Sequence, residues 1–486
     1  MKKIFNISAL MLLAGFSLMS CTPEVDDVFD ESAAERTAKA QKMYTDLLVA
    51  DGGKWQMEYF TNSDEPGYVY VMTFDKDGSV MIAGENKYIA KLSNIEATTP
   101  GYGEERSLWE VIVDNGPTLT FNSYNKVFHL FSNPEDIPDT DASEAGEGHL
   151  GDYEFSLMKY SGDTLYMTGK KHKIDILMTR LDVGVEDRAY LDEVIGLSSK
   201  FFSSLIPEVF ITLPNGARYL TQDGASLIMS MAPEANETRT KDQDADWISF
   251  VESHNAILTP AGLRFMNPIT LYGTYEARQA YEAYWKENPE ATHEPDIADV
   301  YKVQTFVLQD DGSLLCREDG VTRIAADALG KVFASPGIKW RINLDKGEGA
   351  LAEAIAAFST GMLDRDGSIV QTIDFMLDHV TRDSSTGEIT DYFFTMEANV
   401  RRRRGGTFKM DFYYQPTVNA DGSVSLVFDG YNAAATTYVT NVPQVGALLE
   451  MLAATNLTAS AESRLAPTTL TLSGGDSGYF IVDAVK

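Results

Sequence analysis

The sequence predicts a mainly β protein with helices, an α+β chain of antiparallel meander barrel or sandwich units that short helices join. Three observations lead to this fold class. Hydrophobic residues make up 44% of the 486 residues, which is enough for large packed cores. Apolar and polar residues alternate with a period of two from Lys54 onward, as in half-buried strands. Turn signals separate many short β-forming runs, and the hairpin-type tripeptide Asp-Gly-Ser recurs through the chain.

Residues 1–20 are typical of a secretory signal peptide. Met1–Lys3 is a basic start, an apolar run follows over 4–18, and the small residue Ser20 precedes Cys21. A cysteine at this point predicts a lipoprotein that is cut before Cys21 and acylated there with chains such as palmitate. The apolar run is shorter than the ~20 residues of a spanning helix. The alternative interpretation is a buried helix of the fold.

Residues 21–50 are expected to form a tether and an N-terminal helix. Five acidic side chains lie in the tether, residues 22–31. An acidic stretch just after the lipid site resembles the export signal of Bacteroidota surface lipoproteins. That resemblance implies a protein anchored by lipid to the outer membrane and exposed at the cell surface. The helix is predicted over 30–50, because Ser32 and Glu35 have the spacing of a capping box.

A first β domain is predicted at 51–185, with a closed meander barrel as its shape. Trp55 is expected to plug the barrel floor, and the alternative is that its ring stacks on a ligand. The acidic loop 133–148 has residue types that suit Ca²⁺, although solvated turns are the simpler interpretation. After the strand that starts at Lys54, further strands are expected at 68–74, 79–83, 108–113, 118–121, 127–131, 153–158, 164–168 and 173–179.

Two further domains are predicted, a second β-rich domain at 186–333 and a C-terminal α+β domain at 334–486. A helical pattern that begins near Tyr272 and stops before Pro289 interrupts the strands of the second domain. Helices are expected at 187–205, 346–362 and 445–453. Strands are expected at 209–213, 226–229, 247–251, 262–265, 303–308, 368–375, 392–402, 407–414, 423–428 and 478–482.

The net charge excludes one class of partner. The chain has 40 basic and 72 acidic residues, a net charge of −32, and removal of residues 1–20 takes away two lysines and leaves −34. Such a surface repels nucleic acid phosphates, so no nucleic acid partner is expected. Cys316 is the only cysteine besides Cys21, so no disulfide between free thiols is expected, and Cys316 is assigned to a core.

Several short segments carry a resemblance over about residues 21–310. They are Asp26-Asp27-Val28-Phe29, Ser32-Ala33-Ala34-Glu35-Arg36, Lys54-Trp55-Gln56-Met57-Glu58-Tyr59, Thr73-Phe74-Asp75, Asp77-Gly78-Ser79-Val80, Gly151-Asp152-Tyr153-Glu154-Phe155, Gly169-Lys170-Lys171 and Thr259-Pro260-Ala261-Gly262-Leu263-Arg264-Phe265. Together they resemble a Bacteroidota outer-membrane lipoprotein family of unknown function with an N-terminal lipocalin-like β unit. The resemblance implies accessory capture or processing of an extracellular polymer or protein beside a nutrient transporter. It also implies that 274–302 is an insertion in this chain.

An aromatic cluster in that insertion is the candidate ligand-binding site. Tyr281, Tyr284 and Trp285 are spaced i, i+3 and i+4, so a helix places their rings on one face. Sugar-binding surfaces present such faces to the C–H groups of pyranose rings. The alternative is that the rings pack the helix onto its own domain.

Other candidates predict no reaction. The run Arg401–Arg404 starts at the end of the strand expected at 392–402, and on a strand two arginines would point to each face. The run is expected either to pair with surrounding acids or to recognise an anionic sugar or phosphate. The histidines lack zinc-ligand spacing, and no nucleophile elbow or phosphate-binding loop is present, so no catalytic residue, metal or cofactor is assigned. A carboxylate pair of a glycosidase would meet only in the fold, and the sequence does not single one out.

The leading expectation is a surface-anchored, non-catalytic protein that binds a glycan or glycopeptide in an outer-membrane transporter complex. The alternatives are an extracellular hydrolase with paired carboxylates and a structural or partner-binding subunit of the envelope. An exposed aromatic platform would favour binding, and a deep cleft with converging carboxylates would favour hydrolysis.

Overall fold

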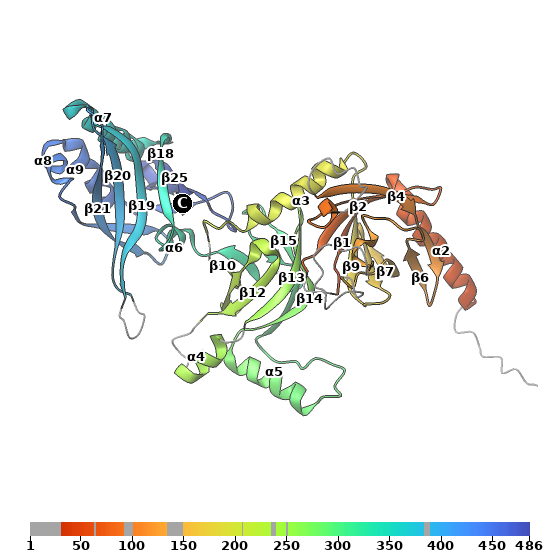
Figure 1. The fold of residues 1–486 in the computed structure, drawn as a ribbon. Coiled ribbons are helices and arrows are strands. Elements are labelled where there is room, and N and C mark those ends of the chain that lie inside the picture. The colour runs from red at the N-terminus through yellow and green to blue at the C-terminus, as the bar shows by residue number, and fades with distance from the viewer. Residues whose placement is uncertain are drawn as a thin grey trace, which may run out of the picture.

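The computed structural model describes residues 31–62, 65–91, 101–133, 149–206, 208–234, 240–248, 251–382 and 389–486. The predicted signal peptide, Cys21, residues 22–30 of the tether and residues 134–148 of the acidic loop lie outside the described residues. Three antiparallel β-sheets follow one another along the chain and form an elongated molecule, with the N-terminal helix at one end and the third sheet at the other (Figure 1). Among the described helices, none combines the length and apolar character needed to cross a membrane.

The predicted N-terminal helix is present as α2, Ala33–Val49. The hydroxyl of Ser32 accepts a hydrogen bond from the backbone N–H of Glu35, whose carboxylate accepts from the N–H of Ser32, so the capping box is formed. Tyr44 and Leu48 are buried against the first sheet, and the Gln41 side-chain amide donates to the Val111 carbonyl at 2.7 Å. The helix therefore covers one end of the first sheet.

The first sheet has nine strands in the order β4-β3-β2-β1-β9-β8-β7-β6-β5. Its strands are β1 Lys54–Tyr59, β2 Tyr68–Phe74, β3 Ser79–Glu85, β4 Tyr102–Leu108, β5 Glu110–Val113, β6 Pro117–Thr120, β7 Glu154–Ser161, β8 Thr164–Gly169 and β9 Asp175–Arg180. The first strand pairs with the last, as in a barrel. Hydrogen bonds do not close the ring, however, because β4 and β5 are its two edges.

Trp109 explains why the predicted single strand at 108–113 is interrupted. Its side chain is buried, its indole N–H donates to the Ser79 carbonyl at 3.0 Å, and its ring packs on Phe74 at 5.0 Å between centroids. The chain bends there, so β4 pairs with β3 whereas β5 pairs with β6. The two edges are thus consecutive in the chain, and the first sheet curls almost into a barrel.

Trp55 is a buried structural residue, as one of its two interpretations predicted, although the first sheet is not a closed barrel whose floor it could plug. It is fully buried, and its indole N–H donates to the Leu48 carbonyl of α2 at 2.9 Å. The Arg180 guanidinium lies 4.2 Å from the Trp55 ring and donates to the Ala50 and Leu47 carbonyls. The Trp55 side chain therefore connects β1, β9 and the end of α2, and no face of its ring is left for a ligand.

Hydrogen bonds close the second sheet, and not the first, into a barrel, so the prediction of a closed barrel at 51–185 is wrong. Helix α3, Asp187–Phe201, leads into it, and β10 pairs with β17 to complete the ring. The strands are β10 Val209–Thr212, β11 Arg218–Gln222, β12 Ile228–Pro233, β13 Glu252–Thr259, β14 Gly262–Tyr272, β15 Val300–Leu308, β16 Leu314–Cys316 and β17 Arg323–Ala326. The strand predicted at 247–251 is wrong, since Trp247 belongs to helix α4, Lys241–Ile248.

The first two sheets share a buried polar junction. Glu58 of β1 and Arg264 of β14 form an ion pair, and the Arg264 side chain is only 5% exposed. The Arg264 guanidinium also lies 4.9 Å from the Phe60 ring. Helix α3 adds the Lys54–Asp187 ion pair at 2.6 Å. Because both faces of β1 are buried, the first and second sheets pack as one body.

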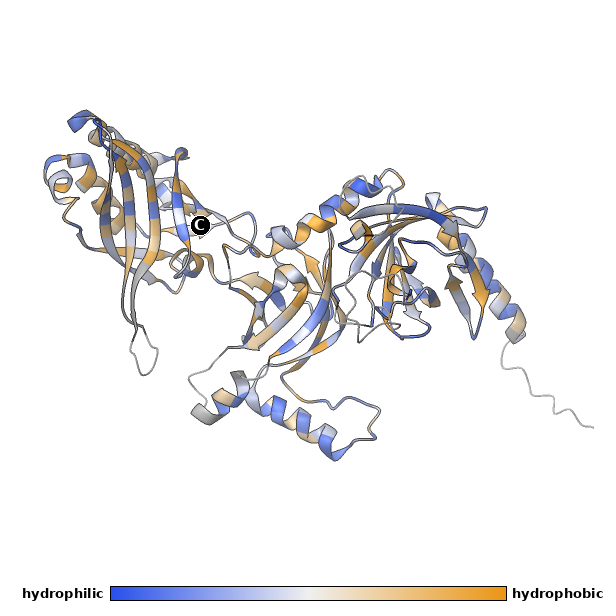
Figure 2. Cartoon of the chain, in the orientation of Figure 1, coloured by the Kyte–Doolittle hydropathy of each residue, from blue (hydrophilic) through white to orange (hydrophobic). Residues whose placement is uncertain are grey.

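The third sheet has the order β22-β21-β20-β19-β18-β25-β24-β23 and wraps around α7 and α9 (Figure 1). Figure 2 shows apolar residues along its inner strands. Its core joins Phe358 of α7 and Leu448 of α9 to Phe375 and Phe394. The elements are α6 Leu329–Phe333, β18 Lys339–Glu348, α7 Gly349–Asp366, β19 Ile369–Arg382, β20 Ile389–Arg401, β21 Thr407–Val418, β22 Val424–Tyr431, α8 Thr436–Asn441, α9 Pro443–Ala454, β23 Thr458–Ser460, β24 Thr469–Ser473 and β25 Tyr479–Val485.

Candidate binding site on the β14–β15 excursion

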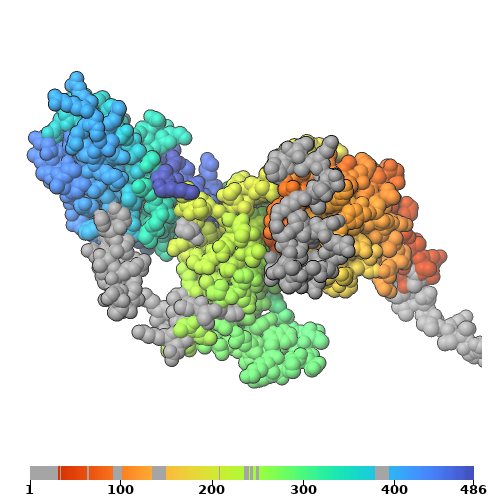
Figure 3. Space-filling model, viewed as in Figure 1, coloured from red at the N-terminus to blue at the C-terminus, as the bar shows by residue number. Residues whose placement is uncertain are grey.

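Residues 273–299 leave the barrel between β14 and β15 and return to the point where they left it. Tyr272 lies opposite Val300 in the strand pair, and the Gly273 N–H donates to the Asp299 carbonyl at 2.8 Å. Between these points the chain forms helix α5, Tyr275–Glu287, and an extended return segment, residues 288–299. This excursion stands out from the barrel as a separate lobe (Figures 1 and 3).

Local signals in the sequence explain why α5 forms. Thr274 has an extended backbone, and its hydroxyl accepts from the Ala277 N–H at 3.1 Å, as an N-cap does. Arg278 binds Glu282 one turn later at 2.8 Å. The Arg278 guanidinium also donates to the Asp246 carbonyl of α4 at 3.2 Å. The helix is therefore capped at its start and attached to a neighbouring helix.

The three predicted binding residues do come together. Ring centroids are 6.2 Å apart for Tyr281 and Trp285, and 5.4 Å apart for Tyr284 and Trp285. Tyr281 continues the line to Tyr272 on the barrel rim at 5.7 Å. The Trp285 contacts are edge-to-face and all three side chains are half-buried, so the rings interlock and do not form a flat, fully exposed platform.

The two tyrosine hydroxyls hold the return segment. Tyr281 donates to the Glu294 carboxylate at 2.7 Å, and Tyr284 donates to the His293 carbonyl at 3.3 Å. Hydrogen bonds from Lys302 and then Tyr281 lower the pKa of Glu294, so this carboxylate stays ionised and acts only as an acceptor. Glu294 and Lys302 were not predicted as site residues, because their separation from the helix follows no helical or strand period.

The excursion is acidic. Its acidic side chains outnumber the basic side chains of Arg278 and Lys286, and Figure 2 shows α5 as largely hydrophilic. The acidic residues are Glu276, Glu282, Glu287, Glu290, Glu294, Asp296 and Asp299. A ligand that packs here should therefore be neutral or positively charged.

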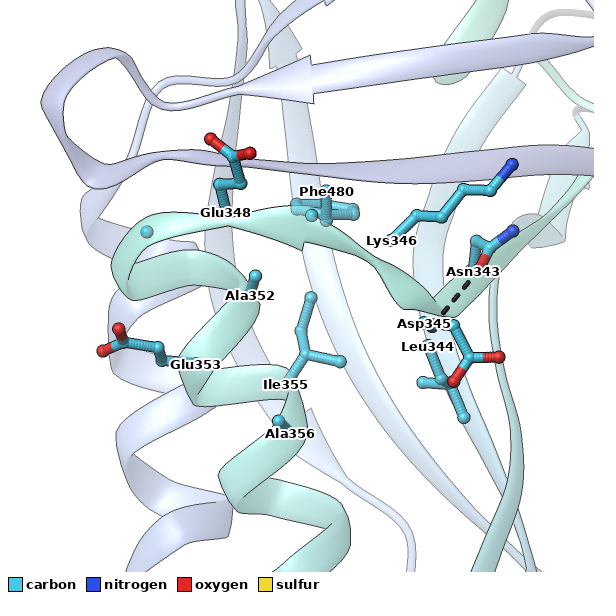
Figure 4. Close-up of a pocket in the computed structure, with 12 residues that line it drawn as sticks. Asn343, Leu344, Asp345, Lys346, Glu348, Ala352, Glu353, Ile355, Ala356 and Phe480 are labelled. Carbon is cyan, nitrogen blue, oxygen red and sulfur yellow. Dashed lines mark hydrogen bonds between the residues drawn. The ribbon is translucent and has the colours of Figure 1, made fainter.

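A cavity beside the third sheet has no catalytic arrangement of side chains. It measures about 390 Å³ and lies where the β18–β25 register shifts between Ile342 and Gly347 (Figure 4). Ala352, Ile355 and Phe480 make its floor apolar. Its rim carboxylates, Asp345, Glu348 and Glu353, point in different directions and do not converge.

A cluster around Glu65 is built for structure more than for proton transfer. The Glu65 carboxylate accepts from the hydroxyls of Tyr68, at 2.6 Å, and Tyr88, and lies 3.3 Å from His149 Nδ1. Burial by itself would raise its pKa, but the hydrogen bonds from His149, Tyr68 and Tyr88 and the charge of Lys87 hold its pKa at about 2. A carboxylate with so low a pKa is a poor general acid or base at neutral pH.

Other candidate groups are buried in cores. The Cys316 thiol is buried as expected, and burial raises its pKa to about 12, so it is unreactive at neutral pH. Burial also lowers the pKa of His129 and of His254, which keeps both rings neutral. Among the residues that the structure describes, no three His, Cys, Asp or Glu side chains gather as metal ligands would.

Comparison with known proteins identifies a family but no activity. No curated protein matches the chain. A crystal structure of the DNA polymerase sliding clamp from Pseudomonas aeruginosa with ligand is 8% identical over 93% of this chain and 98% of that one, with a TM-score of 0.12, which is too low to carry any argument. A family model described as Domain of unknown function (DUF4302) matches residues 25–281, from before α2 into α5. Since this match covers more than half of the chain, the protein belongs to the DUF4302 family.

Proposed function

We propose that this protein is a Bacteroidota outer-membrane lipoprotein, anchored through Cys21 and exposed at the cell surface. There it captures a neutral glycan, or the glycan part of a glycopeptide, beside a nutrient transporter. The binding surface is the excursion, residues 273–299, and the protein performs no chemistry on its ligand. The anchor is supported by the signal-like residues 1–20 and the cysteine that follows them.

The proposal rests mainly on the surroundings of the Trp285 side chain. Its ring is half-buried between two tyrosines, yet no described residue accepts a hydrogen bond from its indole N–H. A sugar can pack C–H groups on the accessible part of the ring and accept from the N–H. Glu294, ionised and close to Tyr281, supplies an acceptor for sugar hydroxyls. The interlocked rings hold Trp285 in place, which lowers the entropy cost of binding.

Hydrolysis has less support. Glycosidases need a carboxylic acid that holds its proton near neutral pH, next to a second carboxylate. In the excursion the pKa of Glu294 is lowered, and the cavity beside α7 has diverging carboxylates. A purely structural role lacks a specific observation in its favour.

Binding is tested with the full chain on an array of neutral and charged glycans. Trp285→Ala should weaken binding of the preferred neutral glycan about tenfold, which corresponds to roughly 1.4 kcal/mol. Tyr284→Phe is the matched control, since it keeps the ring and removes only the hydroxyl bond to the His293 carbonyl. Unchanged binding by Trp285→Ala with an unaltered thermal transition contradicts the proposed site.

The anchor has its own test. Cys21→Ser should remove the acceptor for lipid, so the protein should move from the membrane fraction to the soluble fraction and lose incorporation of labelled palmitate. Cys316→Ser is the control, because that thiol is buried in the barrel core. Membrane retention of the Cys21→Ser protein would overturn anchoring by lipid.

A further inference from the structure

The run Arg401–Arg404 lies at a hairpin turn and not along a strand. Only Arg401 belongs to β20, and β21 begins at Thr407. The Arg402 N–H donates to the Gly406 carbonyl and the Gly405 N–H donates to the Arg402 carbonyl, each at 3.0 Å. Gly405 and Gly406 have φ values of +88° and +80°, which glycine adopts without strain. The strand expected at 392–402 therefore ends at Arg401, and Arg402–Arg404 do not follow the two-faced alternation of a strand.

The arginines are free to bind something outside the chain. All four are exposed, and none forms an ion pair with any residue in the described parts of the chain. Arg218, Arg264 and Arg341 differ, since each binds a carboxylate of its own fold. Four consecutive, permanently charged arginines thus lie at one hairpin end of a chain whose net charge is −32.

Neighbouring rings order part of this turn. The Arg402 guanidinium lies 4.5 Å from the Phe408 ring, and Phe408 stacks on Tyr438 at 5.4 Å. Arg365 lies 4.9 Å from the Tyr438 ring and donates to the Thr437 carbonyl at 2.8 Å. Stacked cations and rings keep two guanidinium groups in place, so less side-chain entropy is lost when an anion binds.

Among the described residues, the nearby carboxylate of Asp366 forms no ion pair with the arginines of the turn. It accepts hydrogen bonds from the Ser368 N–H at 3.0 Å and the Tyr438 hydroxyl at 3.1 Å. The turn itself lies on the third domain, at the opposite end of the molecule from α2 (Figures 1 and 3). A ligand held there would be kept away from the end that leads to the proposed lipid anchor.

We propose that the arginine turn, Arg401–Gly406, binds short anionic oligosaccharides through their carboxylate or sulfate groups. Guanidinium groups match such oxyanions with pairs of parallel hydrogen bonds. The acidic remainder of the surface selects against long polyanions, because nucleic acid and anionic membranes extend well beyond the turn and meet repulsive charge. A short oligosaccharide interacts mainly with the turn, since salt screens charges beyond about 8 Å.

The test is titration calorimetry of the full chain with oligogalacturonate, a sulfated chondroitin oligosaccharide and a neutral cello-oligosaccharide of equal length. Wild-type protein should bind at least one charged probe, and any binding of the neutral probe at the excursion should not change when the arginines are replaced. Replacing Arg401, Arg402, Arg403 and Arg404 together by Gln should weaken that binding at least about tenfold, with an unchanged thermal transition. Replacing all four by Lys should restore part of the affinity, because Lys keeps the charge but cannot form the paired, parallel hydrogen bonds of a guanidinium group.

A charge-matched control separates local from long-range attraction. Lys76, Lys171, Lys173 and Lys200 are exposed residues of the first two domains, and their replacement by Gln removes the same four charges. This control should bind like wild type. The proposal is overturned if the control loses as much affinity as the arginine variant, if no charged probe binds, or if the arginines bind only anionic vesicles or nucleic acid. Because Trp285 is not involved, the site on the excursion can fail or hold independently.

Discussion

At the scale of single residues, partner groups decide what each chemically capable side chain does. The hydroxyls of Tyr281 and Tyr284 both donate hydrogen bonds to the return segment. The indole N–H of Trp285, in contrast, has no acceptor among the described residues. Glu65 and Glu294 are both carboxylates with lowered pKa values, and both are surrounded by donors. Residue type therefore names the possible chemistry, and the neighbours select among the possibilities.

The Glu65 cluster predicts a pH dependence of stability. The pKa of Glu65 is about 2 in the folded chain, against 4.5 for a free glutamate. Because the folded pKa is lower, the ionised carboxylate stabilises the fold above pH 4.5, and this contribution is lost as pH falls from 4.5 towards 2. Glu65→Gln should therefore be less stable than wild type at pH 7.

Urea unfolding at a series of pH values measures this effect. The stability difference between wild type and Glu65→Gln should shrink steadily between pH 4.5 and 2. Glu348→Gln is the control, since that exposed side chain has no hydrogen bond among the described residues. A stability difference that stays constant down to pH 2 would show that the carboxylate charge is not what stabilises the cluster.

At the scale of helices and strands, sequence patterns succeed where the signal is local. The capping box of α2 is recognised from neighbouring residues, and α2 and α5 form where the helical patterns predicted them. Sequence patterns fail where a side chain takes the backbone N–H groups that a strand would use in its sheet. A strand was predicted at 127–131, but the Asn125 side chain accepts from the N–H groups of Val127 and Phe128 and starts a helical turn instead.

Trp109 and the arginine run both show that sequence patterns do not predict exactly where a strand ends. An apolar run predicts one strand at 108–113, but burial of the Trp109 ring bends the backbone there. The arginines are polar enough for either a strand face or a turn, and Gly405-Gly406 decides for the turn. The position of a strand end thus depends on one residue more than on the average of a window.

At the scale of the whole molecule, the junction between the first two sheets predicts how the protein unfolds. Glu58 and Arg264 are a buried ion pair that connects the two sheets. Arg264→Met leaves the Glu58 carboxylate buried without its partner, so it should lower the free energy of unfolding by about 3–5 kcal/mol. Adding Glu58→Gln removes the buried charge and should recover much of that loss.

Differential scanning calorimetry tests this prediction. The single Arg264→Met variant should separate unfolding of the first two domains from that of the third, and the double variant should bring the transitions together again. Arg323→Met is the control, since its pair with Asp311 is exposed on both sides. Equal losses for the Arg264 and Arg323 variants would mean that the junction does not hold the sheets together.

The sequence by itself determined the mainly β class, the signal-like start before Cys21, the capped N-terminal helix, and the aromatic face of α5 that Tyr281, Tyr284 and Trp285 share. These features depend on residues a few positions apart, whose geometry is set by the helix or strand they form. Only the tertiary structure decided which sheet closes into a barrel, which donors surround Glu65 and Glu294, and that the four arginines share one turn. Those outcomes depend on which distant segments pack together, and burial of apolar side chains selects that packing without leaving a periodic signal in the chain.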